Sequence, residues 1–547
     1  MAPTPDTARA GTGPVSASGP RFLASAPMRA SLAAAALYCL AMALAWAGLS
    51  TQMPVDWALE LVLTQELKPY YAASNPPLYS WIAWVLQRLL PPGQAVLLTI
   101  NYLATFATFA LAAFAAHRLF DNRAPNARIL AALAPWSLFL ILPYGRLNFG
   151  FVNTQLLLPC VLASAVLLLA IARRPRLAWF AALGLVAGLG ALTKLNYLFA
   201  IACLLAAALL QPALRAALLR PGLALAVVLA LALAAPYAVA FHEAGNDLLA
   251  LLRSKTGAAS PSLSPMLSYS GRVGAGLASV GAGLANYLGP AFLLGLAGWL
   301  PGRDRRGGRG GRGGRGVDPA QAAARRFLRD TLLIGLAVIL AGVLFFGVTR
   351  VQPWYLHAFF LLGPLYALTF WDAERISRRA VYAAGAVVLG AAAAQTALRA
   401  VEFTPRCIGK CRDVVPYDAL ARQLRTAGFA RGTILSIGVR VAGNLRAHFP
   451  RSRVATLDLR HLPRQRAGPI GQCLVIWRAD EVASMAAARK AVGRAFIALR
   501  LPGPASETPV RTAKLAWHGW PAAGRAGRAG ATVWRYVLIE KGNARCG

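Results

Sequence analysis

Long apolar runs, separated by short polar loops, fill the chain from residue 31 to residue 400. A helix rises 1.5 Å per residue, so about 20 apolar residues cross the roughly 30 Å hydrocarbon layer of a bilayer. Because backbone groups in lipid must bond within their own segment, each run is predicted to be helical. About eleven spans are predicted, at residues 31–50, 94–117, 129–144, 153–172, 177–193, 196–211, 222–241, 275–300, 331–349, 354–371 and 380–398. The shorter run 79–90 could add a helix that dips into the membrane.

The composition agrees with a membrane location. Hydrophobic residues make up 57% of the 547 residues and charged residues only 14%, which leaves too little polar surface to cover a water-soluble core. The net charge of +37 would ordinarily suggest nucleic acid, because basic side chains release counterions from phosphates. The Arg-Gly tract at 303–316 also resembles an RNA-binding tract. It lies between two spans, however, so residues 301–330 are interpreted as a cytoplasmic loop that contacts membrane lipids, and no nucleic acid is expected.

Basic residues concentrate in alternate loops. By the positive-inside rule these loops face the cytoplasm, together with residues 1–30, which show no apolar period and are interpreted as a disordered tail. The first loop, 51–78, then lies on the outer side, and an odd number of spans places residues 401–547 there too. That last domain is itself basic, but long domains translocate largely regardless of charge. The basic loops hold Arg118, Arg123, Arg128, Arg173, Arg174, Arg176, Arg215, Arg220, the arginines from 303 to 329, Arg375, Arg378 and Arg379.

Residues 401–547 are predicted to form a small α/β domain. Short runs rich in β-formers alternate with helical patterns. The predicted strands are 433–437, 473–477, 496–500 and 532–539, and the predicted helices are 417–427, 440–448 and 481–492. Four of the seven cysteines fall here, which fits an oxidising periplasm and up to two disulfides, with three possible pairings. A zinc site is the alternative, although Cys407 and Cys411 lack the CxxC spacing. The other two of the four are Cys473 and Cys546.

The stretch from Val55 to Trp84 gathers polar groups in a chain where charge is otherwise scarce outside the basic loops. It is interpreted as the place where a polar substrate is handled. The polar residues are Asp56, Glu60, Glu66, Lys68, Tyr70, Tyr71 and Asn75, followed by Pro76-Pro77.

An acid after the first span, then Gln65, then Tyr70 and the sequence NPPLYSW at 75–81, resemble the bacterial dolichyl-phosphate-mannose protein mannosyltransferases, family 39 glycosyltransferases. Looser similarity extends along the chain, at Asn148 and Asn153 through QLLLP (155–159), and at GLVAGLGALTKLNYLF (184–199), TRVQPWYLHAFFLLGP (349–364) and NLRAHFP (444–450). The family is related to the aminoarabinose transferase that modifies lipid A.

This resemblance implies a GT-C fold for residues 31–400, with 401–547 as a periplasmic domain in a bacterial inner-membrane protein. It implies transfer of a sugar from a polyprenyl-phosphate donor to a cell-envelope acceptor: lipid A, another glycan or a protein. The chemistry needs a base for the acceptor hydroxyl and cations for the phosphate.

The resemblance gives Asp56 the role of the base. The alternative is that Asp56 caps a helix starting at Trp57. Glu60 lies one helical turn later on the same face, where it could position the acceptor or a metal, or be a solvated surface carboxylate. Lys194 is the candidate for the phosphate, and the alternative is an amine that reaches toward water.

Further substrate contacts are predicted around these residues. Arg350 and His357 flank Trp354 and Tyr355 at the outer end of a span, where they could contact a phosphate or a sugar; aromatic residues there are also ordinary membrane anchors. The remaining candidates are Tyr70, Asn75, Arg146 and Asn148.

One departure from the family concerns metal. Relatives often carry a second acid near the second outer loop, and this chain has none between Pro143 and Gln155. No metal ligands are therefore assigned and a divalent metal is doubtful, because hard cations prefer several carboxylate oxygens.

Two other functions stay open. A transporter or flippase for a lipid-linked sugar would show internal repeats and ionisable residues in mid-membrane. An inactive scaffold of the same fold would also fit the missing acid.

Overall fold

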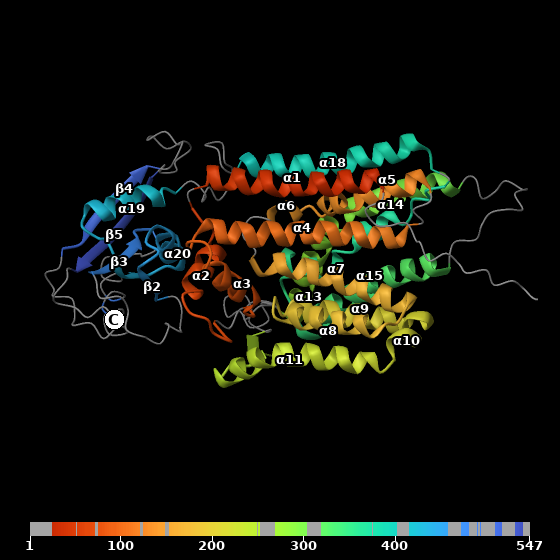
Figure 1. Ribbon diagram of the computed structural model, residues 1–547, viewed down its shortest axis with the longest axis horizontal. Helices are drawn as coiled ribbons and strands as arrows, with labels where there is room; N and C mark the ends of the chain where they lie inside the picture. The colour runs from red at the N-terminus through yellow and green to blue at the C-terminus, as the bar shows by residue number, and fades with distance from the viewer. Residues whose placement is uncertain are drawn as a thin grey trace, which may run out of the picture.

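A computed structural model describes most of the chain, and Figure 1 shows it as a long helical bundle with a small sheet at one end. The helices of the bundle run roughly along its long axis. The described residues are 25–50, 52–71, 75–120, 124–147, 152–248, 250–251, 268–303, 319–374, 376–401, 415–457, 472–480, 490, 493, 509–516 and 531–539.

The bundle combines long helices with short ones at its ends. The longer helices are α1 (Ala26–Leu49), α4 (Gln94–Leu119), α5 (Pro125–Ser137), α7 (Val152–Arg173), α8 (Leu177–Ala191), α9 (Asn196–Leu210), α11 (Gly222–Glu243), α13 (Tyr269–Tyr287), α14 (Gly289–Arg303), α15 (Pro319–Phe346) and α18 (Arg378–Val401). The shorter ones are α2 (Val55–Leu63), α3 (Leu78–Leu86), η2 (Leu138–Leu140), α6 (Tyr144–Leu147), α10 (Pro212–Leu218), α16 (Pro353–Phe360) and α17 (Gly363–Leu368).

All eleven predicted runs are helical, but fewer are long enough to count as single spans. Among the described residues, six helices are long and apolar enough to cross a membrane, and two bent pairs raise the number to eight. The other three runs, 129–144, 177–193 and 354–371, form shorter helices. Prolines explain two of the breaks, since the helices in 129–144 and 354–371 are interrupted near Pro143 and Pro364. The number of about eleven spans is therefore not confirmed.

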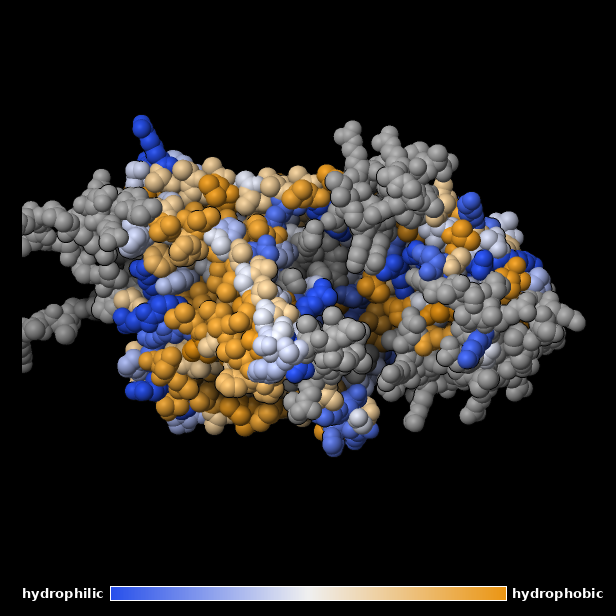
Figure 2. All heavy atoms as spheres, turned by 180° about the vertical axis from the view of Figure 1, so that it is seen from behind, coloured by the Kyte–Doolittle hydropathy of each residue, from blue (hydrophilic) through white to orange (hydrophobic). Residues whose placement is uncertain are grey.

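Helix α1 shows why the bundle belongs in lipid. Its buried residues, Met28, Ser31, Ala35, Cys39 and Trp46, recur at helical spacing along one face. The opposite face is also apolar, with Leu37, Leu40 and Leu44 exposed by 57–67%. A helix that is apolar all round needs an apolar surrounding. Figure 2 shows the same along the bundle, where hydrophobic atoms form a broad band with hydrophilic atoms at its ends.

The C-terminal unit has five described strands in the order β2-β1-β3-β5-β4. β1 runs parallel to β2 and β3, whereas β5 is antiparallel to both β3 and β4. Helices α19 (Tyr417–Thr426) and α20 (Val439–His448) belong to the same unit. The strands are β1 (Gly432–Ser436), β2 (Arg453–Thr456), β3 (Gln472–Arg478), β4 (Arg511–Ala516) and β5 (Ala531–Ile539).

Most of the predicted elements of this unit are confirmed. The predictions missed β2, which has only four residues, and the mostly exposed edge strand β4. The predicted strand 496–500 lies outside the described residues, as does nearly all of the helix 481–492. Cys473 is disulfide-bonded, as expected for this domain, while Cys407, Cys411 and Cys546 also lie outside the described residues.

Helices α2 and α3 lie between the bundle and the sheet (Figure 1). The first loop and the C-terminal unit are thus at the same end of the bundle. The class predicted from the sequence, a helical membrane protein with a small C-terminal α/β unit, is confirmed.

Close backbone contact joins helices α8 and α11, which pack side by side. A Cβ atom at Gly184 would lie 2.5 Å from the carbonyl oxygen of Ala226 and 2.7 Å from its Cα. Backbone atoms cannot rotate out of the way, so any side chain at residue 184 must push the two helices apart.

Gly184→Ala should therefore destabilise the protein by roughly 1–3 kcal/mol through overpacking. Gly390→Ala in α18 is the matched control, because a Cβ there meets nothing within 4 Å. Alanine favours helix by about 0.5–1 kcal/mol over glycine, so this control should be neutral or stabilising. Melting temperatures in detergent measure both, and equal shifts would contradict the close contact.

Candidate functional site

Helix α2 carries the predicted base. It begins at Val55 after Pro54, which occupies the N-cap position without a side-chain hydrogen bond. Asp56 is thus the second residue of the helix, and the alternative that it caps a helix starting at Trp57 is wrong. A carboxylate in the first turn faces the positive end of the helix dipole, which favours its ionised form. The Asp56 side chain is half-buried.

Glu60 lies one turn after Asp56 and is only 3% exposed. The Ser80 hydroxyl donates a hydrogen bond of 2.6 Å to Glu60 Oε2. Burial raises the pKa of Glu60 to about 7; the bond from Ser80 opposes this shift, and the charge of Asp56 adds to it. The alternative of a solvated carboxylate without a partner is therefore wrong.

Helix α3 connects these carboxylates to the other half of the site. It starts after Pro76-Pro77, where proline removes the backbone donors and favours a helix start. The amide of Leu78 donates to the carbonyl of Leu192 at 3.0 Å. Leu192 lies two residues before Lys194 in the loop between α8 and α9. The helix that contacts Glu60 is thus fixed to the loop that carries the predicted phosphate ligand.

The Lys194 side chain is held inside the bundle end. Its Nζ donates to Thr154 Oγ1 at 2.8 Å and lies 5.5 Å from the centroid of the Tyr355 ring. Thr154 belongs to the first turn of α7 and Tyr355 to α16. The amine is therefore directed by two neighbouring helices, which makes free extension toward water a poor description of it.

The other predicted contact residues are divided between interior and surface. His357 is 1% exposed and its Nδ1 lies 2.5 Å from the Tyr287 hydroxyl, whereas Arg350 is exposed. Tyr70 packs against Phe241 of α11 with ring centroids 5.7 Å apart. Asn75 is half-buried just before Pro76.

The second outer loop is only partly described. Arg146 lies in the short helix α6, and Asn148 lies outside the described residues. Gln395 of α18 fixes the turn before them: its Oε1 accepts from the Gly145 amide at 2.6 Å, and its Nε2 donates to the Ile141 carbonyl at 3.3 Å. A Cβ at Gly145 would lie 2.6 Å from the same Oε1, so a larger residue there would displace the Gln395 amide.

The roles of Ser80 and Thr154 were not predicted from the sequence, and Asn153 was noted only as part of the family resemblance. Ser80 and Thr154 direct Glu60 and Lys194, but a serine 20 residues and a threonine 40 residues away carry no local signal. Asn153 is 4% exposed, and neither polar atom of its side chain has a hydrogen-bond partner among the described residues. A buried amide without a partner is costly. Its position beside Thr154 makes it a candidate for contact with substrate.

A metal ion in the described part of the chain would need several ligand side chains gathered around it. No group of three or more His, Cys, Asp or Glu residues gathers there in a way that could hold an ion. Asp56 and Glu60 form only a pair, and Glu60 is engaged by Ser80.

Glu60→Gln should change how stability depends on pH. With a folded-state pKa of about 7 against an ordinary 4.5, the stabilisation from protonated Glu60 is fully present below pH 4.5 and is lost as pH rises through about 7. Glutamine resembles the protonated carboxyl and can still accept from Ser80. The melting temperature of the variant minus that of the wild type should therefore be larger at pH 8 than at pH 5. Glu66→Gln, a control at a half-buried residue of the same loop, should give the same difference at both pH values. Parallel curves for Glu60→Gln would contradict the buried acid.

The chain is similar to one protein family and to two crystal structures of known proteins. The family model of the dolichyl-phosphate-mannose-protein mannosyltransferases matches residues 74–239. No curated protein matches the chain. Two crystal structures of ArnT from Cupriavidus metallidurans are similar to it, one bound to undecaprenyl phosphate and one in the apo state, with identities of 16% and 15% and TM-scores of 0.47 and 0.49. Each comparison covers 91% of this chain and 97% of the ArnT chain.

The matched segment includes NPPLYSW and Lys194, which were among the residues that suggested the family. Asp56 precedes the match, so its role as the base stays a prediction. Over residues 74–239, the chain is thus similar to the dolichyl-phosphate-mannose-protein mannosyltransferase family.

Proposed function

We propose that this protein is an inverting glycosyltransferase of the GT-C type, which transfers a sugar from a polyprenyl phosphate to an acceptor of the cell envelope. The acceptor is lipid A, another glycan or a protein. The observation that carries the proposal is the hydrogen bond from the Leu78 amide to the Leu192 carbonyl. It joins the helix that contacts the buried acid to the loop that presents the Lys194 amine.

The proposed reaction is a single displacement at the anomeric carbon of the donor sugar, with Asp56 as the base. The Asp56 carboxylate takes the proton of an acceptor hydroxyl, and the hydroxyl oxygen attacks the anomeric carbon of the donor sugar. The bond between that carbon and the phosphate oxygen breaks, and the oxygen keeps the electron pair and leaves on polyprenyl phosphate. One displacement from the opposite face inverts the anomeric centre. Positioned base catalysis of this kind typically contributes about 10²–10⁴-fold to the rate.

Glu60 supports the base through its charge state. At neutral pH much of Glu60 is protonated, because burial raises its pKa to about 7. A neutral group next to Asp56 adds no second negative charge, so Asp56 can stay ionised and accept a proton. Glu60 is also proposed to help orient the acceptor, as are Tyr70 and Asn75 in the same loop.

Lys194 is proposed to bind the phosphate that leaves. The amine already has a fixed direction, set by Thr154 and Tyr355. A cation held in place stabilises the charge that develops on the leaving phosphate without having to reorganise. Arg350, Arg146, Asn148 and His357 are proposed to contribute further contacts to the phosphate and the sugar.

The reaction is proposed to take place on the periplasmic face of the inner membrane. The arginine-rich loops of the chain alternate with loops poor in basic residues, and the polar stretch that contains Asp56 is one of the latter. The cytoplasmic N-terminus and the periplasmic C-terminal domain follow from the same rule.

Asp56→Asn should abolish transfer while the protein stays folded, with a loss of about 10²–10⁴-fold in rate because the general base is removed. Radiolabelled polyprenyl-phosphate sugar in membrane vesicles provides the assay. Asp372→Asn is the control, since Asp372 lies between α17 and α18, outside the proposed site. Full activity of Asp56→Asn would contradict the assignment. Movement of labelled lipid across the membrane without covalent transfer would identify a flippase, and inactivity of the wild type would leave the scaffold.

Lys194→Met should weaken binding of undecaprenyl phosphate by roughly 10-fold to 100-fold, as expected for losing one hydrogen bond from a charged donor. Methionine keeps the length of the side chain and removes the charge. Titration of purified protein in detergent, followed by tryptophan fluorescence, measures the change. Lys68→Met is the control in the first loop, where Lys68 pairs with Glu66 at 2.9 Å. Equal affinities for wild type and Lys194→Met would contradict the phosphate site.

A further inference from the structure

Helix α2 is held at its N-terminal end by the C-terminal unit. The Met53 amide donates to Asn444 Oδ1 at 2.7 Å, and Asn444 Nδ2 donates back to the Met53 carbonyl at 3.2 Å. Asn444 belongs to α20 and is 1% exposed. A single side chain thus satisfies both backbone groups of the residue that precedes the cap of α2.

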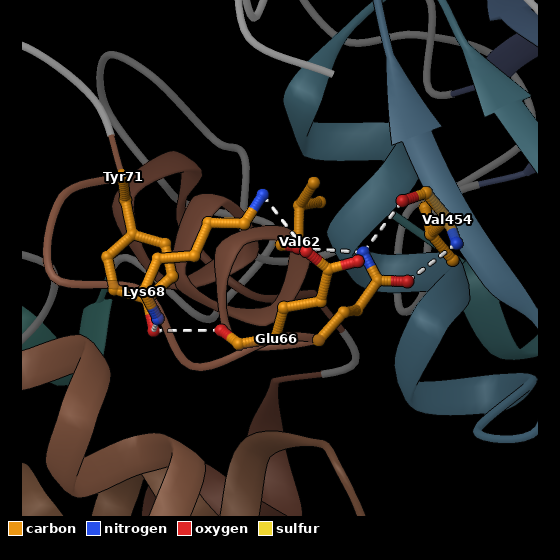
Figure 3. Close-up of polar contacts among 6 residues, drawn as sticks. Val62, Glu66, Lys68, Tyr71 and Val454 are labelled. Atoms are coloured by element: carbon orange, nitrogen blue, oxygen red, sulfur yellow. Dashed lines mark hydrogen bonds and ion pairs between the residues drawn. The ribbon is translucent and has the colours of Figure 1, made fainter. Parts of the chain in front are cut away.

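The C-terminal end of α2 is held in the same way. The Val454 amide donates to Gln65 Oε1 at 2.8 Å, and Gln65 Nε2 donates to the carbonyls of Val454 and Val62, each at 2.7 Å. Figure 3 shows Val62 and Val454 on the two sides of this contact, one on the first loop and one on the sheet. Gln65 therefore pairs with the backbone of β2 as a neighbouring strand would.

The middle of α2 leaves no space between the two units. A Cβ at Gly443 would lie 2.0 Å from the Ala58 carbonyl oxygen, so α20 and α2 are in backbone contact. Val62 belongs to the hydrophobic core of the C-terminal unit, whereas Trp57 and Leu61 belong to the core of the bundle. The helix that carries Asp56 is thus shared between two cores.

We propose that the C-terminal unit positions the reacting carboxylates, and that Asn444 and Gln65 are positioning residues that fix α2 relative to the Lys194 loop. The inference rests on the proposed function, because it gives these residues a role in that reaction. They act through α2 and do not touch the substrate.

The short length of α2 gives the proposal its physical basis. A helix of nine residues does not hold its shape alone in water, so its position depends on what surrounds it. Loss of the Asn444 contacts would leave the backbone groups of Met53 without partners and let water reach the region of Glu60. Donor binding should be spared, since Thr154, Lys194 and Tyr355 lie on other elements.

The charge of Glu60 reports on this position. Its raised pKa depends first on burial, so a shift of α2 that hydrates the carboxyl should return the pKa toward 4.5. The other titratable groups near Glu60, or on elements that pack against α2, are Asp56, Glu66, Tyr71, Tyr79, Arg440, Arg446 and His448.

The test compares Asn444→Leu and Gln65→Leu with a matched control, Gln472→Leu. Gln472 makes the same kind of two-way backbone contact, to Ala430 N and Gly428 O, but entirely within the C-terminal unit. Both test variants should reduce turnover at least 10-fold, keep the affinity for undecaprenyl phosphate within 2-fold, and move the titration of Glu60 to lower pH. Gln472→Leu should change none of the three. In an Asp56→Asn background, Asn444→Leu should cause no further loss of transfer.

Several outcomes would overturn the proposal. Equal losses of turnover and donor affinity would indicate a purely structural role, as would an unmoved Glu60 titration in folded Asn444→Leu and Gln65→Leu protein. The titration is read from melting temperatures of each variant with and without Glu60→Gln, so it requires no transfer activity. If wild-type protein transfers no sugar but the variants still move this titration, the proposed function fails while the positioning of α2 stands.

Discussion

The short helix α2 depends on two hydrophobic cores that close on it from opposite sides. Trp57 packs on Trp46 of α1 with ring centroids 5.2 Å apart, while Val62 enters the core of the C-terminal unit. Burial on both sides removes water from Glu60, and the loss of water raises its pKa. The electrostatics of the site are therefore a consequence of how the two units meet.

A backbone hydrogen bond connects helix α3, which carries Ser80, to the loop that carries Lys194. The Leu78 amide is free to bond outside its helix because it belongs to the first turn of α3, where backbone donors lack partners within the helix. It uses the Leu192 carbonyl at the end of α8. Acid and amine are thus fixed by backbone bonds, with Ser80 and Thr154 directing the two side chains.

The sequence predicted the features that depend on local pattern. Apolar length identified the long helices of the bundle, and alternating β-rich and helical segments identified β1, β3, β5, α19 and α20. It also indicated the polar loop and the family, from Asp56 to NPPLYSW. Composition cannot show where a helix bends, and bent or shortened helices are the reason why fewer of the described helices than the eleven predicted runs have the length of a span.

Contacts between distant residues were beyond the reach of sequence patterns. The bond between Ser80 and Glu60, the direction of Lys194, and the clamp of Asn444 on Met53 all depend on tertiary packing. Asp56 was open to two interpretations because the start of α2 was placed two residues too late. Pro54 provides the N-cap, a residue without a side-chain acceptor, so the local rule for capping gave the wrong answer.

The clamp on Met53 also orders events during synthesis of the chain. Asn444 follows its partner by 391 residues. At about 5–20 residues per second, a ribosome adds that length in roughly 20–80 seconds. Throughout that interval the nascent protein can insert its membrane helices, yet its first loop lacks the groups that complete it. An incomplete polypeptide consequently lacks the Asn444 contacts that hold the N-terminal end of α2.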